Sequence, residues 1–130
     1  MKRTFLVITS MAAVLFVLGG AFTAKDNSTA GIEMPEDIGK IIKKSCIGCH
    51  SDKSKNTKGK TKMNFDNLLN GKYSKGKQIA KLNSIVKTLS KGKMPPPKFL
   101  KKHPERALLP GELKTLSQWA KNEMSTLMGK

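Results

Sequence analysis

The stretch Cys46-Ile47-Gly48-Cys49-His50 decides how this chain folds. It holds both cysteines of the 130-residue chain, and a histidine follows directly after the second one. Cysteines at this spacing occur in redox-active disulfides, in zinc sites and at the attachment point of c-type haem. The rest of the sequence distinguishes these three interpretations.

A thioredoxin-like disulfide would need strands around the motif, and the sequence shows no convincing strand pattern. A structural zinc site would need about four protein ligands, and outside the motif only His103 is left as a strong nitrogen or sulfur donor. In the haem interpretation, the two thiols add to the vinyl groups on one edge of the porphyrin. The adjacent imidazole is then held under the iron. We therefore predict one covalent haem c on Cys46 and Cys49, with His50 as the proximal iron ligand.

The first 24 residues have the composition of a targeting segment. Lys2 and Arg3 precede a nearly unbroken apolar run over residues 5–18, and small residues follow at 19–21. The run is shorter than the roughly 20 apolar residues of a membrane span. We therefore predict a signal peptide over residues 1–24 and a periplasmic or otherwise exported protein. An uncleaved N-terminal anchor is the alternative, and it would be the only link to a membrane apart from surface association.

The chain is strongly basic, with 25 Lys and Arg against 9 Asp and Glu. Removal of residues 1–24 takes away two basic residues, which leaves 23 against 9 and a net charge of +14. Residues 51–62 contain five lysines and no apolar side chain. Because aromatic residues are absent from this stretch and the chain is predicted to be exported, we expect no nucleic-acid partner. We predict a solvated, mobile loop here.

The remaining apolar pattern predicts helices and no strands. We expect a flexible leader over residues 25–33 and a haem-binding domain over residues 34–130. Its first helix begins near Pro35, which suits the first helical position, and delivers the motif at its end. A short helix near Asn67 is expected to be capped by Asp66.

Two longer helices complete the predicted domain. One runs from Lys77 to Ser90, with Gly92 as its C-cap. The other runs from about Pro110 to Met124. Their apolar residues recur at helical spacing: Ile79, Leu82, Val86 and Leu89 on the first, and Leu113, Leu116 and Ala120 on the second.

Met94 opens the segment Met94-Pro95-Pro96-Pro97, whose prolines stiffen the backbone. A thioether binds iron weakly and gains from being held in place, and Met/His ligation is a known cytochrome c arrangement. We therefore predict Met94 as the distal iron ligand. His103 is the main rival, through bis-His ligation. Weaker rivals are Met63, Met124 and Met128.

Several of these residues together give a resemblance that extends from Cys46 to the end of the chain. The segments that carry it are Cys46–His50, Met63–Asp66, Gly92–Pro96, His103-Pro104 and the helix around Trp119-Ala120. In these the chain resembles the small haem-binding c-type cytochrome domain of exported bacterial proteins. The resemblance implies an all-α, cytochrome-c-like fold with one haem, thioether bonds at the two cysteines, and His50 and Met94 as axial ligands. Relatives place a Trp-Pro pair soon after the haem motif, where this chain has lysine-rich sequence.

The expected function is single-electron transfer, with the iron cycling between Fe(II) and Fe(III). No acid–base pair or nucleophile in the sequence indicates an enzyme. The alternatives are a haem module that binds or senses a small ligand such as NO or CO, and an accessory subunit of a redox complex. Exposed lysines around Met94 are expected to favour acidic redox proteins as partners.

Overall fold

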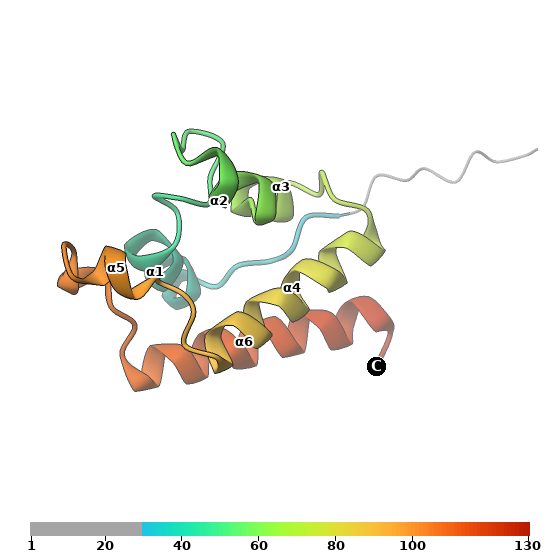
Figure 1. Ribbon diagram of the computed structural model, residues 1–130. Helices are drawn as coiled ribbons and strands as arrows, with labels where there is room; N and C mark the ends of the chain where they lie inside the picture. Colours follow the sequence, from blue (N-terminus) through green and yellow to red (C-terminus); the bar gives the residue numbers. More distant parts are fainter. Residues whose placement is uncertain (1–29) are drawn as a thin grey trace, which may run out of the picture.

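The computed structural model describes residues 30–130, which form helices and connecting turns with no strand (Figure 1). The elements in chain order are α1 (Glu36–Ser45), α2 (Thr57–Lys62), α3 (Phe65–Leu69), α4 (Lys75–Ser90), α5 (Pro97–Leu100), the 3-10 helix η1 (Pro104–Arg106) and α6 (Pro110–Met128). The predicted all-α fold is confirmed, and the thioredoxin-like alternative loses the strands it requires. The predicted signal peptide lies outside the described residues. Within residues 30–130, each helix is too short or too polar to cross a membrane.

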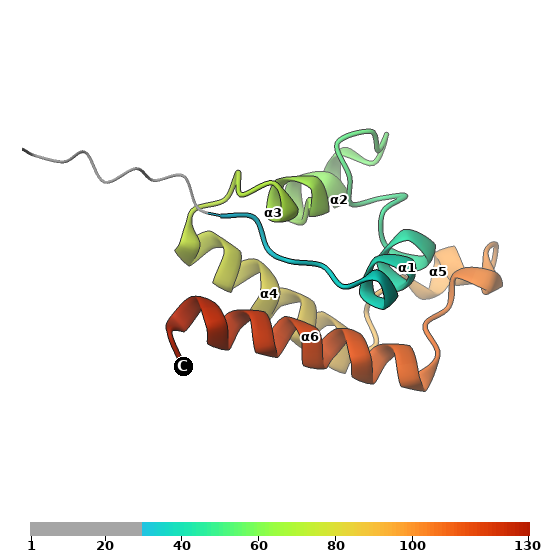
Figure 2. The same cartoon turned by 180° about the vertical axis from the view of Figure 1, so that it is seen from behind.

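Helices α4 and α6 lie side by side and run in opposite directions, and they form the base of the molecule in Figures 1 and 2. The predicted apolar positions belong to the core apart from Ile79, which is half-buried outside it, whereas its neighbour Gln78 is fully buried. Leu82 and Ala120 are fully buried, and Leu116 is almost so. Burial of these side chains holds the pair together, because removing a Leu side chain from water contributes about 2 kcal/mol. Helix α6 continues four residues beyond the predicted end at Met124.

Helix α1 lies across the first turns of α6 and ends where the haem motif begins. Its buried face consists of Ile38, Ile41 and Ile42. Lys44 donates to both carboxylate oxygens of Glu112 on α6, at 2.7 Å and 2.5 Å. This bond fixes the end of α1, and therefore the start of the motif, relative to the long helix pair.

The described part of the predicted flexible leader, residues 30–33, lies against the fold, although Ile32 is the one residue of the four that is buried. Ile32 is buried, and the indole Nε1 of Trp119 donates to the carbonyl of Glu33 at 3.2 Å. The segment runs between α3 and the α4–α6 pair, as Figure 2 shows. It comes so close to α3 that a Cβ added to Gly31 would lie 1.7 Å from the carbonyl oxygen of Leu69. One apolar side chain and a glycine that allows close approach let the segment pack along α3, with Ile32 in the core.

Two predictions for residues 51–70 are wrong. The lysine-rich stretch is not wholly a loop, because residues 57–62 form α2, whose N-cap Asn56 accepts from the N–H of Gly59 at 2.8 Å. The next helix is capped by Asn64, which accepts from the N–H of Asn67 at 3.1 Å. Asp66, the predicted cap, instead accepts from the backbone N–H of Asp52 at 2.7 Å. Small polar side chains therefore organise this region while its lysines point outward.

Helix α4 begins two residues earlier than predicted and ends as predicted. Gly92 has a left-handed backbone, with φ of 59°. The N–H groups of Gly92 and Lys93 donate to the carbonyls of Leu89 and Thr88, at 3.0 Å and 3.1 Å. This pattern is a Schellman C-cap, which only glycine adopts without steric cost. The cap turns the chain into the proline segment.

Candidate functional site

The haem motif folds as a tight turn at the C-terminal end of α1. The N–H groups of Cys49 and His50 both donate to the carbonyl of Cys46, each at 3.1 Å. Cys46 in turn donates to the carbonyl of Ile42 at 2.8 Å. The turn is thus a continuation of the helix, which brings the two thiols and the imidazole together on one short piece of chain.

Cys46 and Cys49 are not joined by a disulfide. Cys46 packs against the core, and burial raises the pKa of its thiol to about 12. A thiol with this pKa stays protonated at neutral pH, which does not suit a reactive redox cysteine. A thioether carries no charge at any pH, so the environment of Cys46 fits a sulfur that is bonded to carbon.

The ring of His50 is held by hydrogen bonds to backbone atoms. Its Nδ1 lies 2.9 Å from the carbonyl oxygen of Gly59 and 3.0 Å from that of Met63, so Nδ1 carries the proton and donates. The carbonyl of His50 accepts from the N–H of Phe65 at 2.9 Å, and the Phe65 ring meets the imidazole edge-on. Within residues 30–130, Nε2 forms no hydrogen bond. This leaves the Nε2 lone pair as the ligating atom, which is how metal-bound histidines are usually arranged.

The zinc alternative gains no support from this arrangement. Among the described residues, no three His, Cys, Asp or Glu side chains form a group that could hold a metal ion. His103, the remaining donor predicted for zinc, stacks on Phe99 with ring centroids 4.7 Å apart. Its Nδ1 lies 3.5 Å from the Glu105 carboxylate.

Met94 lies on a loop that is anchored at both ends. The Schellman cap at Gly92 precedes it, and α5 follows, with the N–H of Phe99 donating to the carbonyl of Pro96 at 2.9 Å. The Met94 side chain is 37% exposed, whereas Pro95 is buried. The predicted extended proline segment is shorter than expected, because Pro97 already starts α5. The loop therefore holds an apolar thioether at the surface, next to a fixed backbone.

The rivals of Met94 have other contacts. Met63 is buried in the core, and its carbonyl accepts from His50 Nδ1. His103 is the N-cap residue of η1 but its side chain forms no capping hydrogen bond, and its ring contacts Phe99 and Glu105 instead. Met124 is half-buried against the core on α6, and Met128 is exposed near its end.

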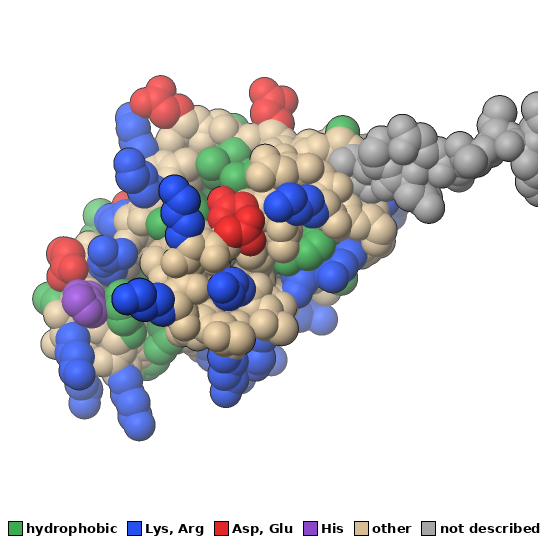
Figure 3. Space-filling model, turned by 90° about the horizontal axis from the view of Figure 1, so that it is seen from above, with side chains coloured by type: hydrophobic (Ala, Val, Ile, Leu, Met, Phe, Trp, Pro, Cys, Tyr) green, Lys and Arg blue, Asp and Glu red, His purple; other side chains and the backbone are tan. Residues whose placement is uncertain are grey.

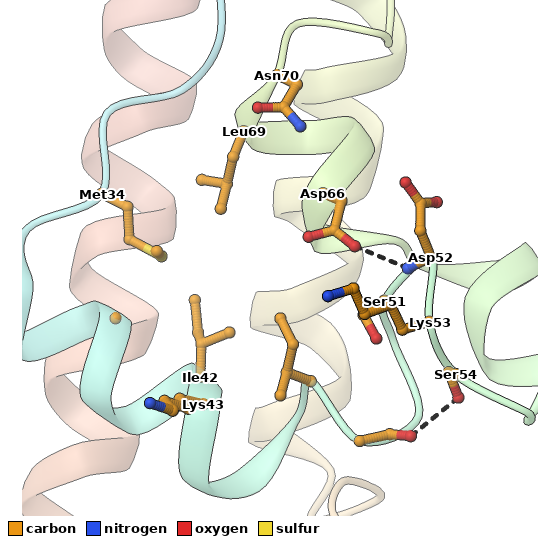
Figure 4. A pocket seen from close by; sticks show the side chains of 13 residues that line it. Met34, Ile42, Lys43, Ser51, Asp52, Lys53, Ser54, Asp66, Leu69 and Asn70 are labelled. Carbon is orange, nitrogen blue, oxygen red and sulfur yellow. Dashed lines mark hydrogen bonds between the residues drawn. The ribbon is translucent and has the colours of Figure 1, made fainter.

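A cleft of about 910 Å³ lies beside the motif, between α1, α3 and the 30–35 segment. Figure 4 shows Met34, Ile42 and Leu69 pointing into it, with the carboxylate of Asp66 on its polar side. Its lining includes Ile47 and Gly48 of the motif but not Cys46, Cys49 or His50. The cleft is thus separate from the side chains that carry the haem chemistry.

Positive charge surrounds the Met94 loop. No acidic residue occurs between Asp66 and Glu105, a stretch that contains ten lysines. Five of these lysines flank the loop and are exposed: Lys91, Lys93, Lys98, Lys101 and Lys102. None of the five forms an ion pair with an acidic group in the described part of the chain. Basic side chains also outnumber acidic ones on the face seen in Figure 3.

Sequence reasoning did not identify the residues that orient His50. Gly59, Met63 and Phe65 contribute through backbone atoms or a ring edge, and backbone contacts leave no residue-type pattern. The sequence did contain one indication. Asn56 is a residue type that caps helices, and Gly59 follows it three residues later inside a polar run.

Comparison with known families finds a haem-binding domain in this chain. A family model described as a haem-binding domain matches residues 55–122, slightly more than half of the chain. The match begins five residues after His50 and covers the Met94 loop and most of α6. No curated protein and no solved structure matches the chain. The chain belongs to the haem-binding domain family.

Proposed function

We propose that this protein is an exported monohaem c-type cytochrome that transfers single electrons. Cys46 and Cys49 hold the haem through thioether bonds, His50 is the proximal ligand and Met94 is the distal ligand. When bound, the haem supplies an iron that accepts and releases one electron. Family membership supports the haem, and the motif and its environment support the covalent attachment.

The observation that carries the proposal is the hydrogen bonding of His50. Two backbone carbonyls accept from Nδ1, which fixes the tautomer and leaves Nε2 as the donor atom. Such a bond also fixes the plane of the ring and makes Nε2 more basic. Hydrogen bonds within the chain therefore already hold His50 in the tautomer that can bind iron through Nε2.

We assign Met94 as the distal ligand because its side chain is exposed and its loop is held at both ends. Of the large apolar side chains in the described part of the chain, only Met94, Leu109 and Met128 are exposed. Met94 alone among them lies on a loop held by a C-cap on one side and a helix on the other. A neutral thioether and a neutral imidazole favour Fe(II) relative to bis-His ligation, so the potential should be high for a c-type haem.

A carrier fits these ligands better than an enzyme or a sensor. Two ligands held on anchored segments have to move little when an electron arrives, whereas a sensor needs a vacant or labile position. The only two cysteines belong to the motif, and as thioethers neither could act as a nucleophile.

The partners we propose are acidic redox proteins, which meet the protein at the lysines around Met94. A field of one sign around the site of electron exit speeds encounter with an opposite charge and weakens with salt. A periplasmic or equivalent exported location is proposed because a basic start followed by an apolar run over residues 5–18 is typical of a signal peptide.

An optical spectrum of the purified protein, oxidised and reduced, tests the proposal. We expect a low-spin c-type spectrum in both states, the weak band at the near-infrared edge that marks Met–Fe(III) ligation, and slow, weak binding of CO by the reduced protein. Rapid CO binding or a high-spin oxidised form would instead support a ligand-binding module.

A further inference from the structure

The lysine-rich stretch after the motif is tied back onto the motif. The Ser54 hydroxyl donates to the carbonyl of Gly48 at 2.9 Å and accepts from the N–H of Asn56 at 3.0 Å. At the other end of α2, the Lys81 ammonium group on α4 donates to the carbonyl of Lys62. Helix α2 is therefore fixed at both ends, against the motif and against the base of the fold.

Gly59 stands inside this short helix, where a glycine is unfavourable by about 1 kcal/mol relative to alanine. The structure shows what this glycine permits. A Cβ on residue 59 would lie 2.6 Å from the carbonyl oxygen of Cys49 and 3.2 Å from Cγ of Asn56. The first atom belongs to the backbone of the motif and cannot move away cheaply. Only glycine allows α2 to approach the motif this closely.

The close approach places the Gly59 carbonyl 2.9 Å from His50 Nδ1, while the same oxygen also accepts from the N–H of Met63 at 3.0 Å. We propose that Gly59 is the positioning residue for the proximal histidine: by bringing α2 against Cys49, it sets the Nδ1 hydrogen bond and through it the reduction potential. This inference rests on the proposed function, since it presumes a haem iron on Nε2.

The expected direction follows from the chemistry of the imidazole. An N–H that donates strongly makes the opposite nitrogen a better electron donor, which stabilises Fe(III) and lowers the potential. Pushing α2 away lengthens the bond, so the potential should rise. The ligands themselves do not change, so haem attachment and the Met–Fe(III) band should persist.

The test uses the full, haem-loaded protein with Gly59→Ala and Asn56→Ala. The first introduces the clash with Cys49, and the second removes the acceptor for the Gly59 N–H. We expect a higher potential in both, larger for Gly59→Ala, and a shifted NMR resonance of the His50 Nδ1 proton. Asn56→Asp keeps an acceptor at the cap and should return both values toward wild type.

Two controls separate positioning from a general loss of stability. Gly76→Ala on α4 makes the same change where nothing lies within 4 Å, and Leu116→Val weakens the core on α6. Neither should move the potential or the Nδ1 resonance. The inference is overturned if Gly59→Ala and Asn56→Ala keep the wild-type values, or if Leu116→Val shifts them equally. If Gly59→Ala does not fold, Asn56→Ala and Asn56→Asp decide alone. Wild-type protein without covalent haem would instead refute the proposed function.

Discussion

His50 Nδ1 lies 3.0 Å from the carbonyl oxygen of Met63, so this methionine supports the imidazole at the ring nitrogen opposite the one proposed to bind iron. Met63 and Met94 thus differ in kind, although both are methionines within 45 residues downstream of the motif. The first is a buried part of the support for His50, and the second is an exposed thioether on an anchored loop.

Replacing Met94 should change the spectrum, the potential and CO binding, whereas replacing Met63 should change none of them. Met94→Ala should abolish the near-infrared-edge band, lower the potential and let the reduced protein bind CO, because it removes the distal sulfur. Met63→Leu, which conserves volume in the core, should leave all three unchanged and cost less than about 1.5 kcal/mol in stability. Optical titration and CO-binding spectra provide the measurements. A spectrum that changes in His103→Ala but not in Met94→Ala would assign the distal position to His103.

The lysines around Met94 should govern encounter with an acidic partner. Charge reversal at Lys93 and Lys98 should slow electron transfer to an acidic redox protein by about tenfold or more at low salt, with the difference shrinking as salt rises. Lys114→Glu with Lys121→Glu, on exposed positions of α6, changes net charge by the same amount and should slow it less. Stopped-flow rates at two ionic strengths are the measurement. Equal slowing in the two double variants would show that net charge, and not a docking surface, matters.

The bond between Lys44 and Glu112 should make stability depend on acid pH. The Lys44 ammonium group, and then the N–H of Leu109, hold the pKa of Glu112 below its ordinary value of 4.5. A lowered folded-state pKa gives a stabilisation that is full above 4.5 and is lost as pH falls through the folded-state value. Glu112→Gln should therefore lower the free energy of unfolding by about 1 kcal/mol at pH 7, and the deficit should narrow in acid.

Urea unfolding of the wild-type and Glu112→Gln proteins, from pH 7 down into acid, gives the two free energies of unfolding. Glu36→Gln is the matched control, because its ion pair with Lys40, at 2.7 Å, is highly exposed on α1. It should cost only a few tenths of a kcal/mol. A deficit in Glu112→Gln that does not change with pH would contradict the role given to its charge.

The packing of residues 30–33 can be tested with one substitution at two places. Gly31→Ala should destabilise the protein by about 2–3 kcal/mol, because its Cβ would lie 1.7 Å from the Leu69 carbonyl oxygen. Gly76→Ala, where the added methyl meets nothing within 4 Å, should be neutral or stabilising by up to about 1 kcal/mol. Thermal unfolding compares them. A neutral Gly31→Ala would show that this segment is the flexible leader its sequence suggested.

The elements that the sequence predicted well are those set by local rules. The apolar spacing of Leu82 and Leu89 defined α4, and Gly92 marked its end, because periodicity and a left-handed C-cap depend only on neighbouring residues. The misassigned elements depend on contacts distant in sequence. Asp66 looked like a helix cap, but the backbone of Asp52 takes its carboxylate.

The candidate site shows the same division. The residue types and spacing of the motif are enough to predict its chemistry. Two thiols at this spacing match the vinyl groups on one edge of a porphyrin, and the adjacent imidazole can reach the iron. The support of His50 was not predictable in this way, because it consists of the carbonyls of Gly59 and Met63. Any residue type supplies a carbonyl, so only the three-dimensional arrangement reveals which ones accept.

Covalent attachment of the haem is the central claim, and mass spectrometry of the denatured protein after acid–acetone extraction tests it most directly. The account predicts a polypeptide heavier by the mass of one haem, with no titratable thiol, and a Cys46→Ala/Cys49→Ala protein that loses its haem to the solvent. A wild-type polypeptide of unmodified mass with two free thiols and freely extracted haem would contradict the account.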